Sequence, residues 1–181
     1  MIQINAVITG TRPILFHNPA AMGKPANAKT KDKVPSPEAE ASSGCYLNHD
    51  KSSLAFPAAN LHRAIIIASR AYRDKRRSVT PYISGSIEVQ PEELLFGTAN
   101  YEIFGCRVKV QRQGVWRSRP MLREWRLGFH LLVDDQDVPP AVVNSLLPMI
   151  EEAGRRIGIG DFRLELGGKF GKFKVTEWIV N

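Results

Sequence analysis

The segment Ile2-Gln3-Ile4-Asn5-Ala6-Val7-Ile8 decides how the fold of this chain begins. Apolar side chains stand at residues 2, 4, 6 and 8, and Gln3, Asn5 and Val7 lie between them. A period of two is the spacing of side chains that share one face of a β-strand. The segment therefore predicts a strand with one apolar face, and Thr11 to His17 lead out of it.

The composition changes sharply beyond this strand. Residues 18–53 hold four prolines, many Ala, Ser and Lys residues, and few large apolar side chains. Such a stretch contributes little to a core and is typical of a mobile loop. Loops of this length inside a domain are usually functional or disordered. We therefore expect a flexible insertion at about residues 18–53, after the first strand.

Helical spacing follows the insertion. Asn60 is a suitable N-cap, and an apolar stripe continues at intervals of three and four residues through Leu61, Ile65, Ala68 and Tyr72. Arg63, Arg70 and Arg77 lie seven residues apart, on another face of this helix if it extends that far. Cations also suit a helix C-terminus, so part of this cluster needs no ligand to explain it.

A strand and a hairpin are predicted next. Apolar residues between 83 and 89 indicate a short strand, and residues 106–110 alternate between apolar and polar side chains. Gln113-Gly114 supplies a turn, and residues 121–133 form the returning strand. On that strand Trp125 shares its face with core residues, and Arg126 lies on the opposite face.

The last third of the chain predicts a helix and a strand. The helix begins near Pro139-Pro140 and ends at Gly158, and a final strand runs from residue 170 to residue 180. The resulting order β-α-β-β-α-β is the ferredoxin-like order, which RNA-recognition domains share. We therefore predict an α+β fold whose antiparallel sheet has both helices on one face. Its other face would be open, and such a face with basic and aromatic side chains is a recurrent surface for single-stranded RNA.

Composition excludes several classes of protein. With 181 residues, 24% charged and 43% hydrophobic, the chain suits one domain over residues 1–181. No run approaches the roughly 18 apolar residues of a membrane span, and the first residues lack the basic region of a signal peptide. Cys45 and Cys106 do not have the spacing of a zinc or iron–sulfur site. We expect a cytoplasmic protein with no cofactor, no metal and no disulfide.

The cations gather in three segments. Residues 63–77 hold six Lys and Arg against one acid, residues 107–126 hold seven against one, and residues 155–174 hold six against two. Together these segments exceed the net charge of +7 of the whole chain, so the acids are segregated elsewhere. Segregation of this kind makes a directional field, which suits a phosphate backbone. The alternative interpretation is a set of solvated helix and strand faces.

The glycine-rich stretch from residue 158 to residue 173 is the most distinctive motif. It lacks the spacing of a Walker loop, and it follows a helix rather than a strand, unlike a dinucleotide-binding fingerprint. Glycines let a backbone approach phosphate closely, and Lys169 and Lys172 add charge. Gly158 fits a helix cap better. Gly167 to Lys172 fit either a hairpin turn or a phosphate site, and Phe170 and Phe173 either stack on a ligand or fill the core.

Four stretches together resemble one family: Thr11 to Asn18, Phe56 to Ala64, Ser118 to Pro120 with Glu124-Trp125, and Gly158 to Phe173. They are similar to small phage and prophage proteins that look like minimal Cas7-type members of the RAMP superfamily of CRISPR proteins. The resemblance implies a ferredoxin-like core with a glycine-rich loop before the last strand, where Gly167 to Gly171 fall. It also implies binding of the guide-RNA backbone and head-to-tail stacking of protomers along the RNA.

We therefore expect a non-catalytic RNA-binding protein. Its partners would be guide RNA, other copies of itself and other effector subunits, and it would not bind a membrane. Arg107, Lys109 and Arg126 would lie on the open sheet face, and Lys169 and Lys172 would hold phosphates at the glycine turn. The complete candidate site is Arg63, Arg70, Arg107, Lys109, Arg126, Arg163, Gly167, Gly168, Lys169 and Lys172.

Two alternatives remain open. The first is a metal-independent, Cas6-like endoribonuclease, with His17 or His62 as its general base. Asp32 is a weaker candidate for cleavage, by its resemblance to the loop aspartate of RNA-cleaving Cas7 subunits. The second is a phage-encoded single-stranded nucleic-acid-binding or inhibitor protein, whose basic face would contact nucleic acid or an acidic partner protein. Trp116, near the hairpin turn and beside Arg117, could stack on a base.

Overall fold

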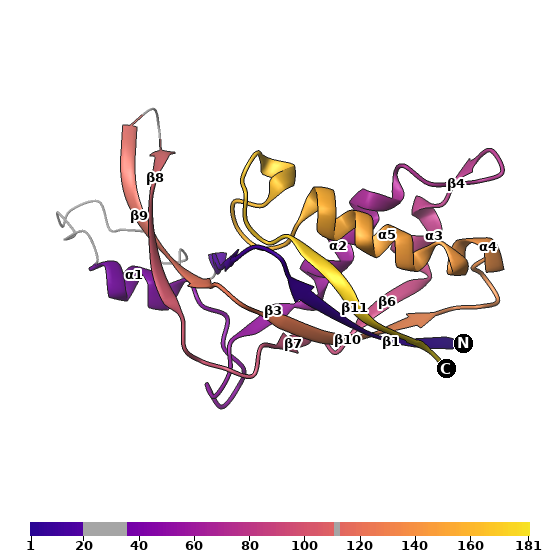
Figure 1. Ribbon diagram of the computed structural model, residues 1–181, viewed down its shortest axis with the longest axis horizontal. Helices are drawn as coiled ribbons and strands as arrows, with labels where there is room; N and C mark the ends of the chain where they lie inside the picture. The colour runs from indigo at the N-terminus through magenta and orange to yellow at the C-terminus, as the bar shows by residue number, and fades with distance from the viewer. Residues whose placement is uncertain (20–35, 111–112) are drawn as a thin grey trace.

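The computed structural model describes residues 1–19, 36–110 and 113–181. Its main sheet has four strands in the order β11-β1-β10-β6, and every neighbouring pair is antiparallel. Figure 1 shows this sheet below the helices, with both chain termini at the same end. The strands are β1 (Ile2–Gly10), β6 (Ile87–Gln90), β10 (Arg126–Val133) and β11 (Phe173–Val180).

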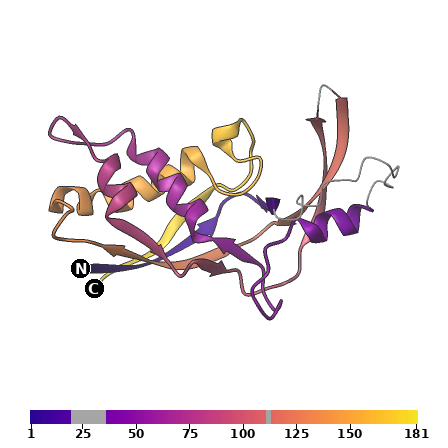
Figure 2. The same ribbon diagram turned by 180° about the vertical axis from the view of Figure 1, so that it is seen from behind.

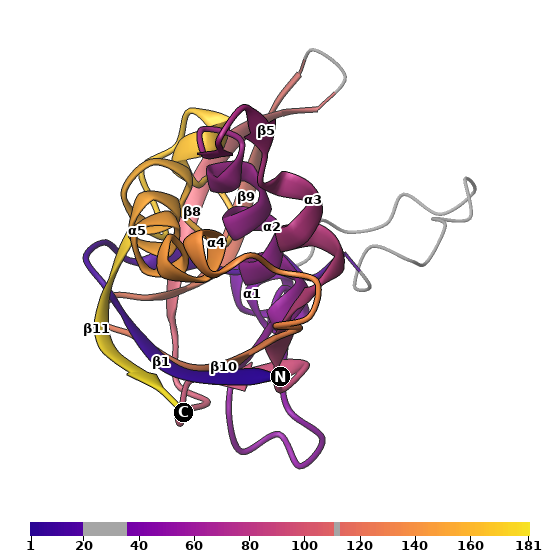
Figure 3. The same ribbon diagram turned by 90° about the vertical axis from the view of Figure 1, so that its right-hand side faces the viewer.

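Helices cover one face of this sheet, as the views from behind and from the end make clear (Figures 2 and 3). The connection from β1 to β6 contains α2 and α3, and the connection from β10 to β11 contains α4, α5 and a π-helical turn. Their bounds are α2 (Ala58–Ser69), α3 (Thr80–Gly85), α4 (Pro140–Asn144), α5 (Leu146–Glu152) and Ala153–Ile157 for the π-helical turn. None of the helices in the described part of the chain is long and apolar enough to cross a membrane.

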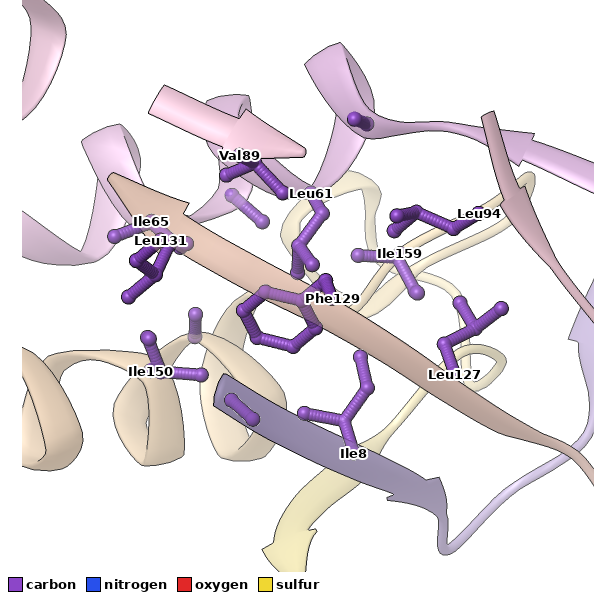
Figure 4. Packing of buried hydrophobic residues seen from close by; sticks show 14 of the residues in the cluster. Ile8, Leu61, Ile65, Val89, Leu94, Leu127, Phe129, Leu131, Ile150 and Ile159 are labelled. Carbon is purple, nitrogen blue, oxygen red and sulfur yellow. The ribbon is translucent and has the colours of Figure 1, made fainter. Parts of the chain in front are cut away.

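The core lies between the helices and the sheet. The alternation predicted for residues 2–8 is confirmed, because Ile4, Ala6 and Ile8 are buried while Gln3 is exposed. Figure 4 shows Ile8 and Phe129 on the sheet beside the helical side chains that pack over them, including Leu61, Ile65 and Ile150. The prediction of a mixed α+β fold with antiparallel sheets is confirmed.

A second sheet projects from one end of the molecule (Figure 1). It has three strands in the order β2-β9-β8, and the long β8–β9 hairpin forms most of it. The strands are β2 (Ile14–Leu15), β8 (Glu102–Val110) and β9 (Gln113–Leu122). Two small two-stranded antiparallel sheets complete the fold: β3 (Ala55–Pro57) pairs with β7 (Glu93–Leu95), and β4 (Arg73–Asp74) forms a hairpin with β5 (Arg77–Ser78).

The prediction of one returning strand over residues 121–133 is wrong. The chain bends after Leu122, and only the part from Arg126 onward enters the main sheet. Trp125 holds the bend, because its backbone oxygen accepts from Gly10 N at 2.9 Å and its indole N–H donates to Arg12 O at 2.8 Å. The turn predicted at residues 113–114 also lies elsewhere, since both residues are already paired with β8.

Two helix boundaries differ from the predictions. The first helix begins at Ala58, so Asn60 lies inside its first turn instead of capping it. It ends at Ser69, and Arg77 belongs to the β4–β5 hairpin rather than to a long helical face. A strand beginning at residue 83 is also wrong, since that residue lies in α3. The second helix begins at Pro140 and stops at Gly158, whose φ of 75° confirms it as the terminator.

Part of the predicted insertion is folded. Within residues 18–53, helix α1 (Pro37–Ser43) packs on the β8–β9 hairpin. Ala41 and Cys45 are buried, which contradicts the expectation that this stretch contributes little to the core. Small side chains make this possible, because a Cβ at Gly44 would lie only 3.1 Å from the Pro120 ring. Residues 20–35 and Asp32 lie outside the described residues.

Candidate nucleic-acid interface

The segment from residue 158 to residue 171, called the glycine loop below, is anchored to the start of the chain. Gly171 N donates to Pro13 O at 2.7 Å, and Asp161 N donates to Leu15 O at 2.9 Å. Within the loop, Ile159 N donates to Gly171 O at 3.0 Å. These bonds place the loop beside β2, between the helical layer and the β8–β9 hairpin (Figure 1).

Close backbone contacts explain two of the loop glycines. A Cβ at Gly171, where φ is +69°, would lie 1.7 Å from Ile159 O, and a Cβ at Gly168 would lie 1.7 Å from Phe162 O. Only glycine fits such an approach. Gly167 differs, because a Cβ there would meet nothing within 4 Å. Packing of the loop against itself therefore accounts for Gly168, and only Gly167 leaves open space for a ligand.

The phenylalanines of this motif fill the core. Phe170 is 7% exposed and packs with Leu15 and Met121, and Phe173 belongs to the main core. Of the two interpretations of these rings, core filling is the one that the structure supports.

A cleft of about 270 Å³, called the α2 cleft below, lies between α2 and the glycine loop. Arg63 and Asn60 line it from α2, Arg163 lines it from the glycine loop, and His17 lines it from the chain that follows β2. Two of the predicted site residues, which are 100 positions apart in the sequence, thus share one cleft.

Asp161, the acid in this cleft, is held by a partly buried ion network. Its carboxylate lies 3.1 Å from Arg119 Nε, and Arg119 also lies 3.9 Å from Glu40 of α1. Glu40 in turn binds Arg117 at 3.3 Å and accepts from Ser118 N at 2.9 Å. The network joins α1, β9 and the glycine loop, and it neutralises the acid that would oppose an anion in the cleft.

The cations of the predicted site differ in whether they are already paired. Arg163 lies 2.8 Å from Glu165, and Arg126 is paired with Glu177. In contrast, Arg63 and Arg70 are exposed and form no ion pair with any described residue. An unpaired cation can attract a phosphate with its full charge, whereas the charge of a paired cation is already neutralised by a carboxylate.

His17 is the histidine of the cleft, and its surroundings alter its pKa. Burial, and secondarily the positive charge of Arg119, lower the pKa of His17 below its ordinary value of 6.5. Both effects disfavour the imidazolium form. His17 is therefore expected to be neutral in the folded protein at neutral pH.

Stability is expected to fall as the pH drops below about 6.5, because the unfolded chain then binds a proton that folded His17 does not. Unfolded molecules carry more protons in that range, so the free energy of unfolding rises with pH. His17→Asn should reduce this slope in urea titrations between pH 5 and pH 8. His49→Asn changes an exposed histidine and is the control; an equal effect of both variants would contradict the prediction.

A second hollow, of about 340 Å³, lies between the glycine turn and the β8–β9 hairpin. Gly167, Gly168 and Lys169 line one side of it, and Phe104 and Arg107 line the other. Lys169 Nζ lies 5.9 Å from the centre of the Phe170 ring. The structure thus brings four predicted site residues together, although not on the surface that the sequence suggested.

The open face of the main sheet is not the predicted basic surface. Arg107 and Lys109 belong to β8 in the second sheet, because the hairpin separates from β10 at the bend; the side chain of Lys109 lies outside the described residues. Of these three residues, only Arg126 lies on the open face, where Glu177 neutralises it. The aromatic side chains of the four strands, Phe129, Phe173 and Trp178, pack against the core.

The remaining candidates lie apart from both hollows. Arg70 caps the C-terminus of α2. Lys172 lines a third hollow, of about 550 Å³, with Arg155 and two glutamates. His62, the other candidate general base, lines neither hollow, and its Nε2 lies 2.7 Å from Ile83 O. No group of three or more metal-binding side chains occurs among the residues that the structure describes.

Sequence reasoning missed the ion network that neutralises the acid of the cleft. Glu40 lies in the stretch that was expected to be mobile, and Asp161 and Arg119 are 42 positions apart. The one available signal was the short motif Ser118-Arg119-Pro120, which carried the family resemblance but no indication of its ionic partners. Asn60, predicted as a cap, lines the cleft instead.

Comparisons with known proteins support the fold. No protein-family model and no curated protein sequence matches the chain. Among solved structures, it is similar to a chain of the type III-B Cmr-β complex bound to cognate target RNA, determined by cryo-electron microscopy. The TM-score is 0.59 at 10% sequence identity, and the match covers 99% of this chain but 60% of that one. At this identity the likeness concerns the fold.

Proposed function

We propose that this protein is a non-catalytic, RAMP-type RNA-binding subunit built on one ferredoxin-like domain. The order β11-β1-β10-β6, with helical connections from β1 to β6 and from β10 to β11, supports a ferredoxin-like core. The fold likeness to a chain of an RNA-bound Cmr complex favours a RAMP-type role over the many other functions of such cores.

The α2 cleft is the proposed site for the RNA backbone. The observation that carries this proposal is that Arg63 enters the cleft without an acidic partner among the described residues, while Arg119 neutralises Asp161. The cleft therefore presents net positive charge to an anion. Lys169, at the turn beside Gly167, extends the cationic surface toward the hairpin.

The proposed partners are guide RNA, further copies of this chain and other effector subunits. A basic chain with segregated charge suits a polyanion that spans several protomers. Head-to-tail stacking along the RNA would let each protomer contribute the same cleft. Purified material whose absorbance at 260 nm exceeds that at 280 nm would support the proposal, and co-purification with an acidic protein but no nucleic acid would favour an inhibitor protein instead.

Salt titration tests the proposed site. Wild-type protein should bind a labelled single-stranded RNA with an affinity that falls steeply with salt, because each phosphate contact releases counterions. Arg63→Gln should weaken binding and reduce the slope of log K against log[salt] by about 0.7, the value for one contact on a single strand. Arg126→Gln removes a cation that Glu177 already neutralises and should change neither. Binding that is insensitive to salt would contradict the proposal.

A second candidate function, metal-independent RNA cleavage, has one observation in its favour. Burial and Arg119 lower the pKa of His17, and this imidazole lies in a cleft that also contains Arg63. A neutral histidine beside a cation is the combination that a general base and a charge stabiliser require. Incubation of labelled RNA in a chelator tests this function. Cleavage that disappears in His17→Ala would support it, and intact RNA would dismiss it.

A further inference from the structure

Two planar side chains lie next to each other on one face of the β8–β9 hairpin. Arg107 of β8 is the direct cross-strand partner of Trp116 of β9. Directly opposed residues in an antiparallel pair point to the same face, and so do residues two positions along each strand. Gly105 and Gly114 therefore share this face with Arg107 and Trp116.

Each planar group covers one of these glycines. A Cβ at Gly105 would lie 2.5 to 2.9 Å from Cζ2, Cε2 and Nε1 of Trp116. A Cβ at Gly114 would lie 2.4 to 2.8 Å from Nε, Nη2 and Cζ of Arg107. The indole and the guanidinium thus occupy the space that side chains would fill, so both lie against the backbone of the hairpin. We call this pair the Trp116–Arg107 platform.

The outer surface of the platform is free. The Trp116 side chain is 62% exposed, and Arg107 is exposed. Neither side chain forms a hydrogen bond or an ion pair with any residue that the structure describes. In contrast, the other two tryptophans pack against the core. A held but uncovered indole beside a guanidinium is a surface on which flat π-systems stack.

We infer that the Trp116–Arg107 platform stacks unpaired nucleobases of a bound single strand. This inference rests on the proposed RNA-binding function and adds the group that contacts bases rather than phosphates. Indole and guanidinium planes both stack on bases irrespective of sequence. An acidic peptide would use the charge of Arg107 but not the indole face, so the combination favours a nucleic acid over a protein.

The hairpin is held at a defined position relative to the α2 cleft. Arg119, three residues after Trp116 on β9, is paired with Asp161 of the glycine loop. Because side chains alternate between the two faces of a strand, Arg119 points to the opposite face of the hairpin from Trp116. The ion pair therefore fixes the position of the hairpin relative to the cleft, and the platform lies on the other face of that hairpin.

Three variants test the platform on unstructured RNA and on the same oligomer with abasic sites. Trp116→Leu should weaken binding of the RNA roughly 5- to 100-fold and leave binding of the abasic oligomer unchanged. Gly105→Ala keeps the indole but displaces it, so it should weaken RNA binding in the same way. Gly128→Ala adds a methyl group in open space on the main sheet and is the matched control.

A double variant distinguishes loss of the stacking contact from unrelated damage to the structure. Gly105→Ala combined with Trp116→Leu should lose no more affinity than Trp116→Leu alone, because both changes act on one stacking contact. Far-ultraviolet circular dichroism and melting temperatures should match the wild type for Trp116→Leu, whose ring is exposed.

The possible failures are distinguishable. Equal affinity of wild-type protein and Trp116→Leu for RNA would overturn the platform, and so would equal affinity of the wild type for RNA and for the abasic oligomer. In both cases salt-dependent binding of RNA would still support the proposed function. Loss of self-association by Trp116→Leu with unchanged RNA affinity would assign the surface to a second copy and also overturn it. Absence of any salt-dependent RNA binding would instead refute the proposed function.

Discussion

Replacing Gly171 by alanine is expected to lower the free energy of unfolding by about 4 kcal/mol, at the upper end of single substitutions. The new Cβ would lie 1.7 Å from Ile159 O, and φ at this residue is +69°. Because the obstacle is backbone and not a side chain, the clash can be relieved only by moving the glycine loop. That movement would break the bonds of Gly171 to Pro13 and Ile159.

Gly167→Ala is the matched control for this prediction. Its φ of +76° carries the same left-handed penalty, of about 1 kcal/mol, but the added methyl group would meet nothing within 4 Å. For a chain of this length the melting temperature should fall by about 10 °C in Gly171→Ala and by about 3 °C in Gly167→Ala. Equal shifts would show that backbone conformation alone, and not the close approach, decides the requirement for glycine.

The second large effect is expected at Arg119, whose side chain is 13% exposed. Arg119→Met removes the cation between Glu40 and Asp161 and should cost about 2 kcal/mol, less than for a fully buried pair because the carboxylates keep some contact with water. The freed charge of Asp161 would then oppose a phosphate in the α2 cleft. RNA affinity should therefore fall together with stability.

Two further variants separate these effects. Arg123→Met breaks an ion pair with Glu102 that is largely exposed, so it should cost less than about 1 kcal/mol and leave RNA binding intact. Adding Asp161→Asn to Arg119→Met should restore RNA affinity, because the repelling charge is removed. Urea denaturation and RNA titration measure both quantities. Unchanged affinity in Arg119→Met would show that Asp161 does not face the bound anion.

The elements that followed a clear periodicity were predictable. The strand at residues 2–8, the helix through Leu61 and Ile65 and the stop at Gly158 depend on local spacing and on one backbone preference. The hairpin was harder, because an alternating pattern states which side chains share a face but not which sheet they join. Trp125, buried at the bend, is what separates β9 from β10.

For the candidate site, too, the sequence predicted some features and not others. The sequence disclosed the cationic residues and the glycine motif, and it indicated that Trp116 could contact a base. It did not disclose that Glu177 neutralises Arg126 or that Gly105 leaves room for the indole. Such features depend on partners far away in the chain, and composition contains no information about them.

By itself, then, the sequence determined the first strand with its buried face, the helix through Leu61 and Ile65, the stop at Gly158 and the surplus of positive charge, because each follows from local spacing or from counting. Only the tertiary structure decided which cations stay unpaired and where they gather. Arg63 lines the α2 cleft without an acidic partner among the described residues, and the acid of that cleft, Asp161, is paired with Arg119 of another element. The charge of a surface is set by distances between residues that the chain keeps far apart until it folds.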